Sequence, residues 1–171
     1  MNTKQIIILG GGFGGVAAAR KLAEVFLWDA KTEITLVNRT PYHEYHADLY
    51  EVATSEEEMT STVQMRESVL IPLRTIFDKK RVRLVYDEIE SLDLEKQHVT
   101  LRAHTLHYDY LVYALGSVSC YYNIPGAKEY SLPLKTSQDA LRIRNSVEFA
   151  IARHRQDITK YALRVVVVGG G

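Results

Sequence analysis

The first hydrophobic segment of the chain has the pattern of a buried strand followed by a turn and a helix. Residues 6–9 are three isoleucines and a leucine, and glycines follow at once. A short apolar run rich in β-branched residues predicts a strand covered on both faces, as in a parallel sheet. From Val16 onward apolar residues recur at helical spacing, so a strand, a glycine turn and a helix are predicted in that order.

Further segments predict more strands. After a polar break at residues 29–32, residues 33–37 have the pattern of a second strand. Residues 81–89 alternate between polar and apolar side chains, and residues 97–102 and 108–115 are predicted to follow as two strands. The turn between these two is placed at residues 103–107, and the three strands are expected to form a small antiparallel unit. Within the last of them, residues 110–115 read as a buried strand that Gly116 ends.

Two further helices and a second glycine-ended strand are also predicted. The segment from Leu70 indicates the start of a short helix with Pro72 in its first turn. Thr136 or Ser137 is expected to cap a helix over residues 138–154. Residues 164–171 repeat the opening pattern, since four valines are followed by three glycines. This repeat predicts a second nucleotide loop whose helix is missing, and hence a truncated protein.

The composition excludes several classes of protein. The chain of 171 residues is long enough for one domain with a hydrophobic core. Lys plus Arg and Asp plus Glu number 21 each, so the zero net charge does not indicate a nucleic-acid partner. One cysteine excludes an internal disulfide framework and suits a reducing, cytoplasmic compartment. No run of about 18 apolar residues indicates a membrane span, and the N-terminal run is too short for a signal peptide.

The glycines after the first strand match the fingerprint of a dinucleotide-binding loop. Gly10, Gly12 and Gly15 have the spacing G-x-G-x-x-G, in the required order of strand, loop and helix. Gly10 allows the tight turn, Gly12 lets a diphosphate approach the backbone, and Gly15 lets the helix pack close to the strand. The N-terminus of the helix then faces the phosphates, which predicts a dinucleotide site.

The end of the second strand is where the ribose of such a ligand is expected. A carboxylate about 20 residues past the glycines is usual there, but this chain has Asn38, followed by Arg39. Asn38 can donate to and accept from a ribose hydroxyl without carrying a charge. Arg39 allows a second interpretation, in which the site binds the 2′-phosphate of NADP. In a third interpretation, Arg39 is a solvated cation of the loop.

The aromatic-rich segment of residues 41–53 contains several metal-ligating residue types: His43, Glu44, His46 and Asp48. Their spacing matches no helical zinc motif, because H-E-x-x-H would need the second histidine one position later. We therefore predict no metal site. The segment is expected to pack beside a flat ligand or to form a buried loop.

Two features follow the strand that ends near residue 115. Gly116 and Ser117 are expected to bring backbone close to a ligand at the carboxyl edge of the sheet. Cys120 has no partner cysteine and is interpreted as an inert thiol.

These motifs together resemble the type II NADH:quinone oxidoreductases, which are flavoproteins with two dinucleotide-binding domains. The resemblance spans essentially all 171 residues through the stretches IIILGGGFGGVAAARKL, TLVNRTPYHEYHADLYEVA, YDYLVYALGS with NIPG, LKTSQDALRIRN and VVVVGGG. It implies an α/β fold, with an FAD-type Rossmann-like parallel sheet and a small antiparallel β-meander. It also implies an FAD-binding domain over residues 1–160, and the truncated start of an NAD(P)H-binding domain over residues 161–171.

The resemblance implies which residues bind the adenosine and diphosphate parts of FAD. Asn38 would hold the adenosine ribose, with Arg39 near the adenosine half, and the backbone at Ile89 would meet adenine. Asn38 departs from the family, in which an acid is usual at this position. The residues implied along the diphosphate are those of the glycine loop: Gly10, Gly12, Phe13, Gly14 and Gly15.

The resemblance also implies a second contact with FAD and the start of the NADH site. Ala114, Leu115 and Gly116 would pass near the cofactor between its phosphates and ribitol. Gly169 and Gly171 would begin the NADH site. No catalytic side chain is predicted, because the family's glutamate near the flavin lies after the second glycine loop.

The expected activity is hydride transfer from NADH to FAD, followed by reduction of a quinone. The family's disulfide-reducing and sulfide-oxidising relatives need more cysteines than the single Cys120 of this chain, which favours the quinone-reducing branch. A peripheral attachment to the inner face of the cytoplasmic membrane would have to come from further sequence. The alternatives are an NAD(P)-binding sensor or partner-binding module, a sulfide:quinone oxidoreductase-like relative, and a remnant that binds no ligand.

Overall fold

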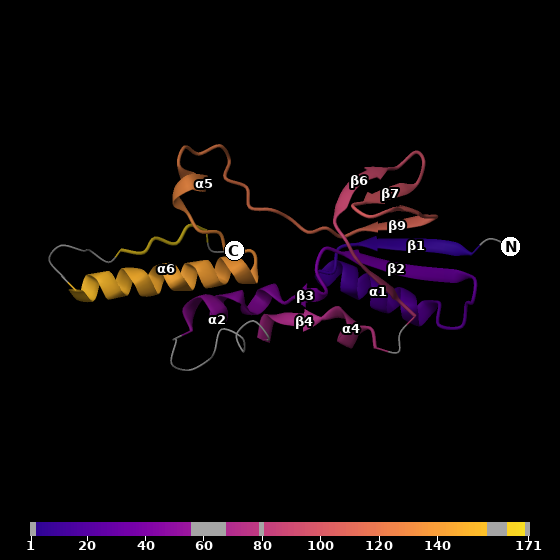
Figure 1. The fold of residues 1–171 in the computed structure, drawn as a ribbon, viewed down its shortest axis with the longest axis horizontal. Helices are drawn as coiled ribbons and strands as arrows, with labels where there is room; N and C mark the ends of the chain where they lie inside the picture. Colours follow the sequence, from indigo (N-terminus) through magenta and orange to yellow (C-terminus); the bar gives the residue numbers. More distant parts are fainter. Residues whose placement is uncertain (1–2, 56–67, 79–80, 157–163, 170–171) are drawn as a thin grey trace. The chain divides into compact units, whose positions relative to one another are not determined.

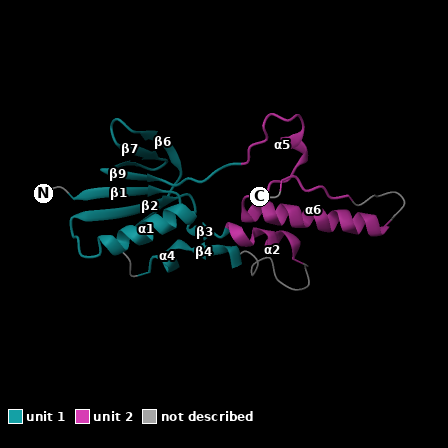
Figure 2. Ribbon diagram, turned by 180° about the vertical axis from the view of Figure 1, so that it is seen from behind, with its two compact units in different colours: residues 1–45, 67–118 teal, residues 46–66, 119–171 magenta. Residues whose placement is uncertain are grey.

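A computed structural model describes residues 3–55, 68–78, 81–156 and 164–169 (Figure 1). The chain forms two compact units, and each is described by itself (Figure 2). Unit 1 comprises residues 1–45 and 67–118, and unit 2 comprises residues 46–66 and 119–171.

The centre of unit 1 is a parallel sheet of four strands (Figure 1). Its strands are β1 (Lys4–Leu9), β2 (Thr32–Asn38), β5 (Arg83–Tyr86) and β9 (Tyr110–Tyr113), in the order β5-β2-β1-β9. Every neighbouring pair is parallel. The chain builds outward from β1 on one side and returns to the other side with β9, so the strand order reverses between β1 and β9. Ligands of open α/β sheets bind at such a switch point, beyond the carboxyl ends of the strands.

Helix α1 (Phe13–Val25) covers one face of this sheet. Since side chains alternate along a strand, Ile6 and Ile8 point to the same face and pack with Ala19 and Ala23 of the helix. Both of these alanines are buried, and their small size lets the helix lie close to the strands. The predicted strand, glycine turn and helix are confirmed, and the helix begins at Phe13, three residues earlier than the apolar spacing indicated.

An antiparallel meander covers the opposite face of the sheet. It consists of β6 (Ile89–Asp93), β7 (His98–Leu101) and β8 (Thr105–His107). Its core joins alternate residues of the central strands to residues of the meander, namely Ile7, Leu9, Val37, Val99, Leu101 and Tyr108. The run Ile6–Leu9 is therefore apolar throughout because helix and meander cover the two faces of the same strand.

The chain does contain a small antiparallel unit, as predicted, but two of the three strands assigned to it are wrong. Residues 103–107 are not a turn, since β8 lies within them and pairs with β7. The strands within residues 81–89 and 108–115, β5 and β9, belong to the parallel sheet. The sequence pattern does not predict β6 as a separate strand. Short strands with mixed exposure have little periodicity, so only their pairing distinguishes the two sheets.

A second correction concerns the segments after β2 and near Leu70. β3 (Tyr42–Glu44) pairs in antiparallel register with β4 (Leu70–Pro72), so the start of the predicted helix is a strand. The helix is α4 (Leu73–Ile76), and Pro72 precedes it at the N-cap. Leu73 and Phe77 are buried against the α1 side of the core.

Unit 2 contains η1 (His46–Asp48), α2 (Leu49–Thr54), α5 (Ala127–Tyr130) and α6 (Ser137–Gln156). α2 contacts α6. The predicted cap of α6 is confirmed, since the N–H of Asp139 donates to Thr136 Oγ1 over 3.1 Å and the N–H of Thr136 donates to Asp139 Oδ2 over 3.1 Å. The predicted turn at Pro125 and Gly126 is also present, with Gly126 at φ +79°.

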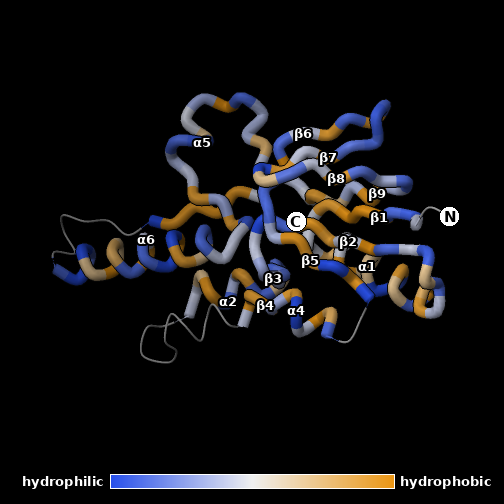
Figure 3. Tube along the Cα trace, turned by 45° about the vertical axis from the view of Figure 1, so that its right-hand side comes forward, coloured by the Kyte–Doolittle hydropathy of each residue, from blue (hydrophilic) through white to orange (hydrophobic). Residues whose placement is uncertain are grey.

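The strand predicted at residues 164–168 is wrong for the described residues of this segment. Residues 164–169 form neither helix nor strand, and the exposed fraction of Val168 is 91%. Gly170 and Gly171 lie outside the described residues. Figure 3 shows apolar runs along β1 and β2 and a more hydrophilic mixture of residues along α6. Across the described residues, no helix has the length and apolar character needed to span a bilayer.

Candidate functional site

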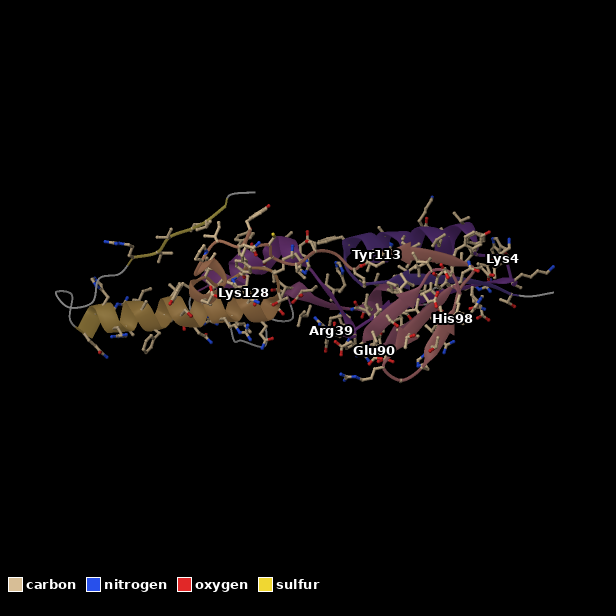
Figure 4. All side chains as sticks on the ribbon, turned by 90° about the horizontal axis from the view of Figure 1, so that it is seen from above. Lys4, Arg39, Glu90, His98, Tyr113 and Lys128 are labelled. Atoms are coloured by element: carbon tan, nitrogen blue, oxygen red, sulfur yellow. The ribbon has the colours of Figure 1, made fainter. Side chains whose placement is uncertain are left out.

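The glycine loop lies at the switch point of the parallel sheet, between the ends of β1 and β9. The N–H of Gly10 donates to the carbonyl of Val37 on one side, over 2.8 Å. The N–H of Ala114 donates to the carbonyl of Leu9 on the other side, over 2.9 Å. Figure 4 shows Arg39 and Tyr113 at the opposite end of unit 1 from Lys4, so the loop lies at the carboxyl ends of the strands.

The three motif glycines lack a side chain for different reasons. Gly10 has φ +102°, and a Cβ there would overlap the carbonyl oxygen of Ala114. A Cβ at Gly15 would overlap the carbonyl oxygen of Gly10, so α1 packs directly against the loop at this residue. At Gly12, the N-cap of α1, a Cβ would meet no described atom within 4 Å. The backbone at Gly12 is therefore open to a ligand, while Gly10 and Gly15 maintain the shape of the loop.

The side chain of Asn38 points at this loop. Its Oδ1 accepts a hydrogen bond from the N–H of Gly11 over 2.8 Å. Its Nδ2 donates to the carbonyls of Thr40 and Tyr42, over 2.9 and 3.1 Å. Arg39, the next residue, is exposed. The roles of Asn38 in holding a ribose and of Arg39 near adenosine stay predictions.

His43 is a site residue that the sequence did not reveal as one. It is buried in β3, and its Nδ1 lies 2.9 Å from the carbonyl oxygen of Gly11. The ring of Phe13 meets the His43 ring edge-on, with centroids 5.0 Å apart, and lies 5.5 Å from the ring of Tyr45. The sequence singles out this histidine by itself only as a candidate metal ligand, within a segment expected to pack beside a flat ligand or to form a buried loop. No local spacing indicates that a residue after β2 contacts the loop after β1.

The predicted contacts beyond the loop lie on two further segments of unit 1. Ala114 borders the loop, Leu115 is exposed, and Gly116 has φ +76° with no described atom within 4 Å of its Cβ position. Ile89 begins β6, beyond β5, and packs against the core of the meander. Their contacts with FAD stay predictions.

A carboxylate fixes the backbone between β5 and β6. Asp87 accepts hydrogen bonds from the N–H groups of Ala103 over 3.1 Å and Glu88 over 2.7 Å. The hydrogen bond from Ala103 is the main cause that lowers the pKa of Asp87 below its ordinary value, and the hydrogen bond from Glu88 and the nearby side chains of His104 and Arg102 lower it further. The N–H of Asp87 donates to the carbonyl of Asn38 over 3.1 Å, so this turn is also connected to the end of β2.

The second glycine loop has one described glycine. Gly169 has φ +90°, and a Cβ there would contact no described atom within 4 Å. Gly171 lies outside the described residues, so its place in an NADH site stays a prediction. Cys120 is an exposed free thiol. In the described ranges, no three His, Cys, Asp or Glu side chains lie close enough together to hold a metal ion.

A glycine loop at the switch point of a parallel sheet, opening onto a helix N-terminus, defines unit 1 as a dinucleotide-binding fold of the Rossmann type. The comparison with known families agrees with this class. Residues 4–171 match the family described as pyridine nucleotide-disulphide oxidoreductase, and the chain belongs to that family.

Two individual relatives are similar to the chain over nearly all of its length. The chain is 26% identical over 168 residues to a type II NADH:quinone oxidoreductase of Staphylococcus saprophyticus, and 30% identical over 174 residues to a demethylphylloquinone reductase of Synechocystis sp.. Each match covers 98% of this chain and 40% of the relative, so the chain spans less than half the length of these proteins.

Among solved structures, the sulfide:quinone oxidoreductase of Aquifex aeolicus superposes with a TM-score of 0.69 at 24% identity. The match covers 87% of this chain and 32% of that structure. At this identity the likeness supports the fold alone.

Proposed function

We propose that the chain is the FAD-binding part of an NAD(P)H-dependent flavoprotein that passes electrons from NADH to a quinone. The observation that carries the proposal is the loop between β1 and α1. Gly10 and Gly15 are packed too closely for any side chain, whereas Gly12 is open. A loop of this shape leaves bare main chain at the N-terminus of a helix, which suits a diphosphate.

The residues around the loop fit the cofactor that the family uses. Gly12, Phe13 and Gly14 would lie along the diphosphate, with Asn38 and Arg39 on the adenosine side. The strand end at Ala114 adjoins Gly10, so residues 114–116 would continue the site toward ribitol. When bound, the flavin supplies the redox chemistry, and the protein supplies binding and orientation.

The proposed electron donor and acceptor are inferred from the names of the relatives and from the second glycine loop. Both relatives are named as quinone-reducing enzymes, and one of them as NADH-dependent. In this proposal residues 1–160 are the FAD-binding domain, and residues 161–171 begin an NAD(P)H-binding domain in which Gly169 and Gly171 take part. The quinone would be reduced by a longer gene product, in the cytoplasm or at the inner face of its membrane.

The absorbance spectrum of the purified chain tests the cofactor. Bound FAD gives a yellow protein and a rise in the melting temperature on addition of FAD. A colourless chain that responds to NADPH but not to FAD would favour the NAD(P)-binding module, for which the exposed Arg39 is the supporting feature. No response to either nucleotide would contradict the proposal altogether.

A turnover assay tests the proposal that the chain of 171 residues lacks a complete NADH site. The chain of 171 residues is expected to show no NADH:quinone oxidoreductase activity, because the proposed NADH site has only begun at Gly169. The longer gene product is expected to be active with NADH and a soluble quinone. Turnover by the short chain would show that the NADH site lies elsewhere.

A further inference from the structure

The peptide unit of Gly11 is held from two directions by side chains. Its N–H donates to Asn38 Oδ1 over 2.8 Å, and its carbonyl oxygen lies 2.9 Å from His43 Nδ1. Because a carbonyl oxygen can only accept, His43 Nδ1 carries the hydrogen of this bond. Gly11 and His43 are both buried. The two hydrogen bonds therefore replace the bonds to water that the N–H and the carbonyl of Gly11 lose on burial.

The amide of Asn38 is almost fully used within the protein. Its Nδ2 has two hydrogens, and the carbonyls of Thr40 and Tyr42 accept them. Its Oδ1 accepts from Gly11 and retains capacity for one more hydrogen bond. Asn38 can therefore accept from one ribose hydroxyl, but in this arrangement it has no hydrogen left to donate to a ligand.

This arrangement gives a physical reason for asparagine in place of an acid at position 38. A carboxylate would retain the bond from the N–H of Gly11. It would also place an oxygen without a hydrogen opposite the carbonyls of Thr40 and Tyr42, at the 2.9 and 3.1 Å over which Nδ2 now donates.

The Asn38 side chain also occupies the space beside Gly11 that a side chain at position 11 would need. A Cβ on Gly11 would lie 2.8 Å from Asn38 Cγ, 2.9 Å from Asn38 Nδ2 and 3.1 Å from Leu73 Cδ1. The φ of Gly11 is not in the left-handed region, in contrast to that of Gly10. Glycine at position 11 is therefore required by the asparagine side chain that fills the space beside it.

We infer that Asn38 and His43 are positioning residues that hold the Gly11 peptide and thereby set the loop that receives the cofactor diphosphate. The inference rests on the proposed function, in that the ligand of the loop is a dinucleotide. Asn38 approaches from β2 and His43 from β3, and the hydrogen bond from Asn38 Nδ2 to the Tyr42 carbonyl connects the two. Phe13, at the start of α1, packs edge-on against His43 and adds an apolar contact between the helix and β3.

The test measures affinities of the chain for FAD, ADP and AMP by calorimetry, with the melting temperature of the ligand-free protein recorded alongside. AMP contains the adenosine ribose, and ADP adds the diphosphate. Asn38→Ala, Asn38→Asp and His43→Leu are each expected to weaken FAD and ADP binding about tenfold, and AMP binding much less. Thr105→Val is the matched control, because it removes an exposed hydroxyl from β8 of the meander and changes no residue of the Asn38 and His43 network.

A pair of conservative variants separates positioning of the loop from general stability. His43→Asn places an amide N–H near the position of Nδ1, whereas His43→Gln places it near Nε2. The asparagine variant is expected to retain FAD affinity within about threefold and the glutamine variant to lose about tenfold.

Each result decides between distinct explanations. Wild-type affinity for FAD and ADP in both Asn38→Ala and His43→Leu would overturn the inference and leave FAD binding standing. Equal losses for AMP and ADP in Asn38→Ala would assign the residue to the ribose and also overturn it. If Asn38→Ala or His43→Leu does not fold, equal affinities of His43→Asn and His43→Gln decide against it. A wild-type chain that binds neither FAD nor ADP would instead refute the proposed function.

Discussion

The chain contains two apolar runs that end in glycines, and they have different structures. Residues 6–9 form the central strand of unit 1, where Ile8 and Leu9 are completely buried. Residues 165–168, in unit 2, are all valine, a residue with high strand preference, yet they form no strand and are 66–91% exposed.

The difference shows that the partners of a segment decide whether it becomes a strand. β1 has hydrogen-bonded neighbours on both sides, with α1 on one face and the meander on the other. Among the described residues, residues 165–168 have no strand paired with them. Strand preference largely reflects packing against neighbours, so the same pattern without neighbours does not determine a structure.

The largest expected contrast is the effect of a charge in each run. Ile8→Asp places a carboxylate where the side chain is 0% exposed, and it should destabilise the chain by more than about 4 kcal/mol, enough to unfold it. Val167→Asp changes a side chain that is 84% exposed, and the stability should change by less than about 0.5 kcal/mol. Urea unfolding followed by circular dichroism measures both.

A longer protein that contains the proposed second domain would give a sharper test of this first prediction. If residues 165–168 pair with further strands there, as the proposed second domain requires, Val167→Asp becomes strongly destabilising in that protein. A similarly small effect in both proteins would contradict the proposed second domain.

The next contrast is between a packed and an open glycine. Gly15→Ala places a Cβ against the carbonyl oxygen of Gly10, so the loop and α1 must move apart, at about 3 kcal/mol of stability. Gly169→Ala meets no described atom within 4 Å, and its segment has no strand pairing that fixes the φ of +90°. A change below about 0.5 kcal/mol is expected there. Comparable losses of stability in the two variants would contradict the packing described for Gly15.

Gly12 separates ligand binding from folding within the first loop. Gly12→Ala should lower the melting temperature of the ligand-free chain only slightly, through the weaker N-cap preference of alanine, because the Cβ position is open and φ is −76°. The same methyl group would meet the diphosphate, so FAD affinity should fall at least about tenfold. Titration of the ligand-free chain with FAD measures this loss, and unchanged affinity would place the diphosphate away from Gly12.

The smallest effect expected is a dependence of stability on pH through Asp87. Its pKa is lowered in the folded chain, first by the hydrogen bond from the Ala103 N–H, so the stabilisation is present above the unfolded pKa of about 4. It is lost as the pH falls below that value toward the folded pKa. Asp87→Asn should therefore lower the melting temperature at pH 7 and flatten its fall as the pH drops below about 4. Parallel curves for the variant and the wild type over that range would contradict this role.

Local patterns were sufficient for much of the fold and for part of the site. The apolar run, glycine spacing and helical periodicity of residues 4–26 identified β1, the loop and α1, because each depends on residues close in sequence. The cap of α6 at Thr136 was predictable for the same reason. The split of residues 81–115 between the parallel sheet and the meander was not, since short strands of both kinds have similar patterns.

The sequence by itself determined the dinucleotide-type loop and the family, because glycine spacing and the order of strand, loop and helix are local properties. The tertiary structure decided the surroundings of the loop. It brought Ala114 against Gly10, and it placed Asn38 and His43 on the two polar groups of Gly11. It also decided that one glycine-ended run is a buried strand and the other is not. These outcomes depend on which distant segments pack together, and no periodicity within either segment encodes that choice.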